Sequence, residues 1–106
     1  MSFTATSPTI CISTTAASKS LALAACRKVR LVNTSTTLIV YVQFGVDSAT
    51  AVIPTSDNAS GTDCVPIPPL RDVIVDVPPG STHVASIGSA AGPTLVHITP
   101  GAEVLR

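Results

Sequence analysis

The sequence predicts an all-β protein, a single-domain antiparallel β-sandwich that is jelly-roll-like or Ig-like and has about eight short strands. Three observations lead to this prediction. A chain of 106 residues has the size of one domain. Nine prolines and six glycines divide it into pieces too short for helices of about ten residues or more. Apolar residues also fail to recur with the helical period over a useful length.

The first 18 residues are mostly Ser, Thr and Ala with little charge. We assign residues 1–18 either to a frayed terminus or to an arm that adds a strand to a neighbouring subunit, because Ile10 and Ile12 alternate with smaller side chains. Residues 19–106 are assigned to the β-sandwich domain. In order along the chain, the predicted strands are Thr9–Ser13, Ser20–Ala24, Lys28–Thr34, Leu38–Phe44, Ala49–Ile53, Leu70–Val77, His83–Ile87 and Thr94–Thr99.

Three of these segments show how their faces should be covered. Residues 72–77 read Asp-Val-Ile-Val-Asp-Val, so the valines share one buried face and the aspartates lie on the other. Residues 28–34 behave similarly, with two basic side chains opposite Val and Leu. Residues 38–42 read Leu-Ile-Val-Tyr-Val and are apolar at every position. We expect this strand to be central and covered on both faces, or covered on one of them by a neighbouring subunit.

The connections carry turn residues. Pro79-Gly80 predicts a type II turn, since proline sets the first φ and glycine accepts a positive second one. Asn33–Thr37 and Gly88–Pro93 have the composition of hairpin loops. The longest irregular stretch is Pro54–Pro69, which is either an extended contact loop or a plain surface connection.

Charge excludes some partners. Six Lys and Arg balance six Asp and Glu, so the chain lacks the broad positive field by which proteins bind nucleic acid or anionic membranes. The charges are nevertheless uneven, because residues 1–53 carry a surplus of basic side chains and residues 54–106 a surplus of acidic ones. This asymmetry indicates either complementary surfaces in an oligomer or ordinary solubilising faces.

With a net charge of zero and a positive mean hydropathy, little electrostatic repulsion opposes association of the chains, which favours a homo-oligomer. No apolar run reaches the roughly 18 residues of a membrane span, and the first residues lack the basic and then apolar order of a signal peptide. We therefore expect no membrane partner. The protein should be made and kept inside a cell, or assembled there into something that later leaves.

Few side chains can carry acid–base chemistry near neutral pH, because the histidines are limited to His83 and His97. Ser81 lies two residues before His83, but it follows a Pro-Gly turn and has no helix after it, unlike the nucleophile of a hydrolase elbow. The spacing of these residues signals no further partner for either histidine. We predict no catalytic residue, and hence no enzyme.

The three cysteines, Cys11, Cys26 and Cys64, are widely spaced and form no CxxC pair. This pattern indicates small buried thiols rather than a disulfide framework or a zinc site. The glycosylation signals at Asn33 and Asn58 are interpreted as chance matches. We predict no metal site, no cofactor and no cofactor-binding residue.

Four segments within residues 27–101 carry a family resemblance. They are Arg-Leu-Val-Asn-Thr at 30–34, Val-Gln-Phe-Gly at 42–45, Val-Pro-Pro-Gly-Ser-Thr-His-Val-Ala at 77–85 and Leu-Val-His-Ile-Thr-Pro-Gly at 95–101. This succession resembles small accessory structural proteins of tailed-bacteriophage virions, of the capsid decoration or cement type. It covers about three quarters of the chain, and the first 26 residues lie outside it.

The resemblance implies a non-enzymatic role. Such proteins sit on the outer surface of the phage head, often as oligomers at symmetry axes, and brace neighbouring capsid subunits. The implied partners are the major capsid protein or other virion proteins, and the implied location is the virion, assembled in the host cytoplasm. No catalytic residue carries over.

Two alternatives remain. One is a structural protein of the tail or neck, or a fibre-associated protein that contacts the host. The other is a small carbohydrate-binding or hydrolytic β-domain. Sugar-binding sites and single-stranded nucleic-acid sites usually present aromatic platforms, and Phe3, Tyr41 and Phe44 are few for that purpose.

Overall fold

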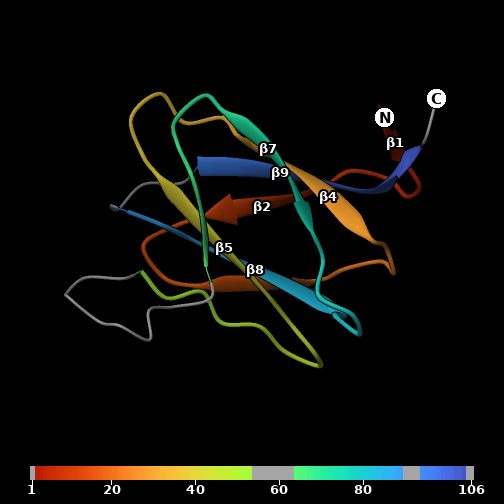
Figure 1. The fold of residues 1–106 in the computed structure, drawn as a ribbon. Helices are drawn as coiled ribbons and strands as arrows, with labels where there is room; N and C mark the ends of the chain where they lie inside the picture. The colour runs from red at the N-terminus through yellow and green to blue at the C-terminus, as the bar shows by residue number, and fades with distance from the viewer. Residues whose placement is uncertain (1, 54–63, 90–93, 105–106) are drawn as a thin grey trace, which may run out of the picture.

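In the computed structural model, which describes residues 2–53, 64–89 and 94–104, the chain forms two antiparallel sheets packed face to face (Figure 1). The described residues contain no helix, and therefore none that could cross a membrane. The prediction of an all-β sandwich is confirmed. The first sheet consists of β1 (Ser2–Ala5), β2 (Ile10–Thr14), β4 (Lys28–Asn33), β7 (Asp72–Asp76) and β9 (Thr94–Val104). The second consists of β3 (Lys19–Ala22), β5 (Val40–Gly45), β6 (Val65–Ile67) and β8 (His83–Gly88).

The strand pairs are nested along the chain. β5 pairs with β6, β4 with β7, β3 with β8 and β2 with β9, and every pair is antiparallel. Pairing of β4 with β9 and of β5 with β8 then completes the two sheets. This arrangement is that of a long antiparallel hairpin rolled into two layers, the jelly-roll topology of eight strands. The strand pairing therefore selects the jelly roll over the Ig-like alternative.

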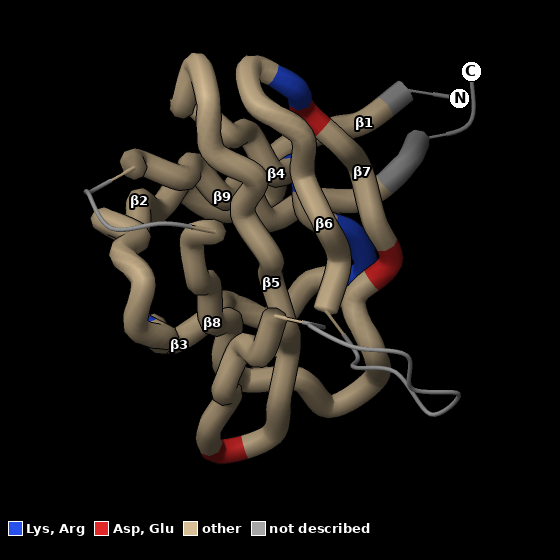
Figure 2. Tube along the Cα trace, turned by 90° about the vertical axis from the view of Figure 1, so that its left-hand side faces the viewer, with Lys and Arg blue, Asp and Glu red and all other residues tan. Residues whose placement is uncertain are grey.

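β1 and β2 lie along the same edge of β9. Ala5 pairs with Gly101 and Ile10 with Ile98. Between these two pairs, the four residues that connect β1 to β2 lie opposite only two residues of β9. The sandwich thus includes the segment that the sequence analysis set apart as an arm or frayed terminus. The reason is the length of β9, whose 11 residues extend beyond its pairing with β4. Figures 1 and 2 show β1 and the end of β9 side by side.

The core lies between the sheets and consists of the inward-facing side chains that alternation predicts. In β4, Val29 and Leu31 are fully buried, whereas Arg30 between them is exposed. In β5, Val40 and Val42 are fully buried, and Tyr41 is half-buried on the outer side. The core cluster consists of Ile12, Leu23, Val29, Leu31, Val40, Val42, Ile67, Val77, Val84, Val96 and Ile98.

The predicted strand at residues 49–53 is wrong. This stretch is irregular and belongs to a segment, residues 46–53, that we call the strap. The amide of Ala51 donates to Ser18 Oγ at 2.9 Å, and the amide of Val52 donates to Cys64 Sγ at 3.2 Å. Ser18 precedes β3 and Cys64 precedes β6, so the strap crosses the outer face of the second sheet between its two edge strands. Ala51 of the strap is itself 2% exposed, and Ala85, whose side chain alternates to that outer face, is fully buried.

The predicted hairpins are also wrong. Residues 33–37 connect β4 to β5, and residues 88–93 connect β8 to β9, and both connections pass from one sheet to the other. The turn at Pro79-Gly80 does have a positive φ, +83°, at Gly80, and the Ser81 amide donates to the Pro78 carbonyl. Of the predicted loop at 54–69, residues 54–63 lie outside the described residues, and residues 65–67 form β6.

Candidate functional site

The two histidines lie on different sheets. His97 is exposed on the outer face of the first sheet, where its register partners are Cys11 on β2 and Val32 on β4. His83 is half-buried on the outer side of β8, in the second sheet, with its Nδ1 atom 2.9 Å from Thr82 Oγ1. Because the sandwich core separates these faces, the two imidazoles do not converge on one site.

Ser81 serves the turn in which it lies. Its hydroxyl donates a hydrogen bond to the carbonyl oxygen of Pro78 at 2.8 Å. The same carbonyl accepts the Ser81 amide. In this structure Ser81 therefore closes the Pro79-Gly80 turn, and its hydroxyl points to the backbone instead of to the ring of His83.

The three thiols are free and lie apart. Cys26 is half-buried against the core, and burial raises its thiol pKa, partly opposed by a hydrogen bond to the backbone of Gly101. Cys64 is half-buried, and its Sγ lies 3.4 Å from Gln43 Oε1. Cys11 is exposed on β2, so the expectation of three buried thiols is wrong for this residue. Over the described ranges, no three His, Cys, Asp or Glu side chains gather as metal ligands.

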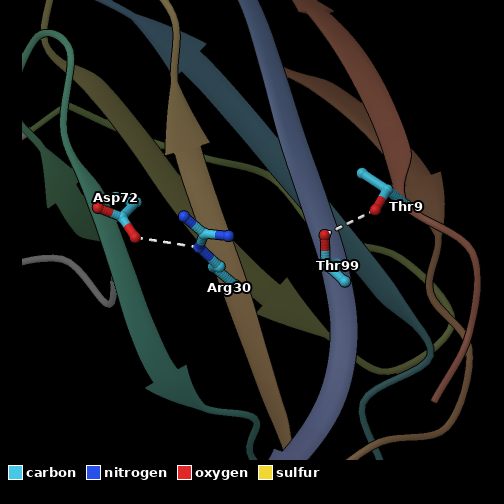
Figure 3. A network of polar contacts seen from close by, with 4 residues as sticks. All are labelled: Thr9, Arg30, Asp72 and Thr99. Carbon is cyan, nitrogen blue, oxygen red and sulfur yellow. Dashed lines mark hydrogen bonds and ion pairs between the residues drawn. The ribbon is translucent and has the colours of Figure 1, made fainter. Parts of the chain in front are cut away.

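Charged residues of the two chain halves pair with each other on the outer face of the first sheet. Arg30 Nε donates to Asp72 Oδ2 at 3.0 Å (Figure 3). Lys28 forms an ion pair with Asp76, and both pairs join β4 to β7. Figure 2 shows basic and acidic segments next to each other along β7. Four of the unevenly distributed charges are thus paired within one molecule, across the register of β4 and β7.

The same outer face is otherwise uncharged over β2 and most of β9. The hydroxyl oxygens of Thr9 and Thr99 lie 2.7 Å apart, in a row with Arg30 (Figure 3). Leu95 on β9 is 49% exposed and Ile74 on β7 is 45% exposed. This surface of hydroxyl, apolar and paired charged groups resembles a protein contact face more than a reaction site.

At one end of the sandwich, a buried asparagine ties two connections together. Asn33, 1% exposed at the end of β4, donates through Nδ2 to the carbonyl oxygens of Leu38 at 2.8 Å, Ile67 at 3.0 Å and Pro68 at 3.3 Å. Its Oδ1 accepts the amide of Ser35 at 2.9 Å. We call this end of the sandwich, with the connections 34–39 and 68–71, the braced end. An asparagine held in this way is not available to a glycan in the folded protein, and Asn58 lies outside the described residues.

The braced end also carries exposed apolar side chains. Leu70 is 66% exposed, and its amide donates to the carbonyl of Ser35 at 3.0 Å. Leu95, the second residue of β9, lies beside the same connection, because its carbonyl accepts the Thr34 hydroxyl at 2.7 Å. The predicted strand Leu70–Val77 starts too early, because Leu70 lies in a turn and β7 begins at Asp72. The signal that could have found this turn is the Pro-Leu pair at 69–70, which repeats the Pro-Gly pattern at 79–80 with a bulky residue in the second position.

We therefore take the braced end and the outer face of the first sheet as the candidate contact surfaces.

Comparisons of this chain with protein-family models, with curated proteins and with solved structures find no match.

Proposed function

We propose that this protein is a non-enzymatic structural component of a virion, a capsid decoration or cement protein that stabilises a phage head through protein–protein contacts. The proposal rests first on the nested strand pairing. A jelly roll is a stiff scaffold of two layers that occurs repeatedly in viral capsid domains, although the same topology also supports unrelated functions. The sequence resemblance to phage decoration proteins points in the same direction.

The polar chemistry of the structure supports a mechanical role. Buried polar groups are used to join elements, as in the clamp of Asn33 on the connections at the braced end. Among the described residues, every buried side-chain nitrogen or oxygen has a hydrogen-bond partner, so none is left unpaired for a substrate. Such a scaffold presents its loops and faces with little change of shape on binding.

Stabilisation of a shell requires no reaction. A protein that binds the assembled capsid and not its loose subunits shifts the assembly equilibrium by mass action. Many copies on one particle, or several copies joined in a homo-oligomer, strengthen the attachment through multivalency. The partner in this proposal is the major capsid protein, and the location is the virion, assembled in the host cytoplasm.

The test is to purify particles and identify their polypeptides by gel electrophoresis and mass spectrometry. The proposal expects this chain in hundreds of copies per particle, and particles from a deletion strain should disrupt at a lower temperature until purified protein is added back. Absence of the chain from particles refutes the proposal. A dozen copies or fewer supports the alternative at the tail or neck, and specific binding on a glycan array would instead support a carbohydrate-binding domain.

A further inference from the structure

Leu70 has a backbone conformation that leucine rarely adopts. Its φ is +56°, in the left-handed region, where a side chain collides with the following carbonyl. A second turn in the same chain allows a comparison. Pro69-Leu70 and Pro79-Gly80 are both turns with a positive φ at the second residue. At position 80 the sequence uses glycine, which adopts this conformation freely. At position 70 it uses leucine, which raises the free energy of the folded state.

Burial does not compensate for this strain. Leu70 is the most exposed of the large apolar side chains in the described part of the chain, at 66%. A side chain with most of its surface in water gains only a minor part of the free energy that drives burial. In the free protein, Leu70 is thus unfavourable both in its backbone and in its side chain, and glycine or asparagine would avoid both penalties.

The surrounding structure holds Leu70 in one place. Its amide donates to the carbonyl of Ser35, and the carbonyl of the next residue, Arg71, accepts the amide of Asn33, each at 3.0 Å. The Asn33 side chain binds the carbonyl of Pro68 on the other side. The leucine therefore projects from a braced loop and does not fold back onto the sandwich.

Arg71, the next residue, differs from the other basic side chains of this region. Arg30 and Lys28 form ion pairs on β4, whereas the Arg71 guanidinium is exposed and has no hydrogen bond or ion pair among the described residues. An apolar side chain beside an unpaired cation is complementary to an apolar pocket with a carboxylate at its rim.

We propose that Leu70 and Arg71 are the contact by which this protein docks onto a partner protein. Leu70 enters an apolar pocket of the partner, and Arg71 pairs with an acidic side chain at the edge of that pocket. The strain and exposure of Leu70 are kept because the buried leucine stabilises the complex. This inference rests on the function proposed above, in which the partner is a protein of the capsid shell.

The decisive variant is Leu70→Gly, because the proposal predicts opposite effects on stability and on binding. Removing the strained side chain should leave the midpoint of thermal unfolding equal to or above that of the wild type. Sedimentation with purified shells that lack this protein should show binding weakened by at least about tenfold. Arg71→Glu should also weaken binding, and more strongly at low salt than at high salt, since it reverses the charge facing the carboxylate.

The matched control is Asp47→Gly. Asp47 is the other non-glycine residue with a positive φ in the described ranges, +64°, and it follows the end of β5, opposite the braced end. This variant relieves the same kind of strain without removing an apolar side chain, so it should bind shells like the wild type. Val46→Ser, at a residue 61% exposed in the same turn, controls for loss of any exposed apolar group.

The outcomes separate the two proposals. Equal binding of wild type and Leu70→Gly overturns the docking proposal while the decoration function stands. A marked fall in the unfolding midpoint of Leu70→Gly also overturns it, because Leu70 would then be a structural residue. If Leu70→Gly changes the oligomeric state and not shell binding, the contact joins copies of this chain and the proposed partner is wrong. Failure of the wild type itself to bind shells removes the decoration function and this inference together.

Discussion

The hydroxyl oxygens of Thr14 and Ser86 lie 2.6 Å apart inside the sandwich, and this hydrogen bond joins β2 of one sheet to β8 of the other. Both side chains are fully buried. Apart from this bond, the Thr14 hydroxyl has only a long contact, 3.5 Å, with the carbonyl of Ile12. The pair is therefore a polar link across a core that is otherwise mostly apolar.

Removal of one hydroxyl of this pair should be costly, because it leaves the other hydroxyl buried without a good partner. Removal of the second hydroxyl should then cost little more. Ser86→Ala leaves the Thr14 hydroxyl buried without a good partner, and we expect it to lower the free energy of unfolding by about 1–3 kcal/mol. Adding Thr14→Val should cost much less than Thr14→Val does alone, because the unpaired hydroxyl is gone. Urea unfolding of the four proteins in this double-mutant cycle measures the coupling, and strictly additive effects would contradict it.

Asn33→Ala should be among the most destabilising changes at the braced end. The three carbonyl oxygens of Leu38, Ile67 and Pro68 lose their shared donor, and a buried acceptor without a partner costs about 1–3 kcal/mol. We expect a loss of at least about 2 kcal/mol in chemical denaturation, given these unpaired groups. Thr34→Ala, at an exposed neighbour with one side-chain bond, is the control and should cost less. Equal losses for the two variants would refute the clamp.

Gly101→Ala should detach β1 from β9. A Cβ at residue 101 would overlap the ring of Phe3 and the carbonyl oxygen of Thr4. We expect faster hydrogen exchange of the amides in residues 2–5, with a smaller effect on the amides of β4. Phe3→Ala in the same chain should not restore protection, because the overlap with the Thr4 backbone remains. Unchanged exchange in Gly101→Ala would show that this edge accommodates a side chain.

Cys26 should react more slowly with a thiol reagent than Cys11. Burial raises the pKa of the Cys26 thiol, so less of the reactive thiolate is present at a given pH, whereas Cys11 is exposed. Alkylation over a pH series, read by mass spectrometry of peptides, tests the order. A faster reaction at Cys26 near neutral pH would contradict the expectation.

The same shift predicts the direction of a pH effect on stability. The folded-state pKa of Cys26 lies above its unfolded value. The contribution of the neutral Cys26 thiol to the free energy of unfolding is therefore fully present below the unfolded pKa. It is lost as the pH rises through the folded pKa, on the alkaline side. A Cys26→Ala variant should lose less stability than the wild type over that alkaline range in denaturation measurements.

Local patterns located most of the strands. Alternation in residues 28–34 and 72–77 predicted β4 and β7 and the side of each that faces the core, because the direction of a side chain in a strand depends only on its position. The same pattern placed charged side chains outside. It did not show that Lys28 pairs with Asp76, since the two residues are 48 positions apart and meet only through the register of β4 and β7.

The errors have a common physical cause. Residues 49–53 have the small and apolar composition of a strand, but the amides of Ala51 and Val52 donate to the side chains of Ser18 and Cys64 and not to another strand. β1 and the three-residue β6 are too short to show a pattern of their own, and they are strands because β9 and β5 offer them an edge. Hydrogen-bond partners distant in the sequence leave no local signature.

Composition and side-chain alternation by themselves determined that this chain is a β-sandwich, which residues face its core and that few groups are suited to catalysis. The tertiary structure alone decided that most connections between strands cross from one sheet to the other, that the strands nest as a jelly roll, and that Leu70 is held outward by Ser35 and Asn33. The physical reason is the range of the interactions. Side-chain direction along a strand repeats every two residues, whereas strand pairing and loop bracing depend on contacts between segments tens of residues apart.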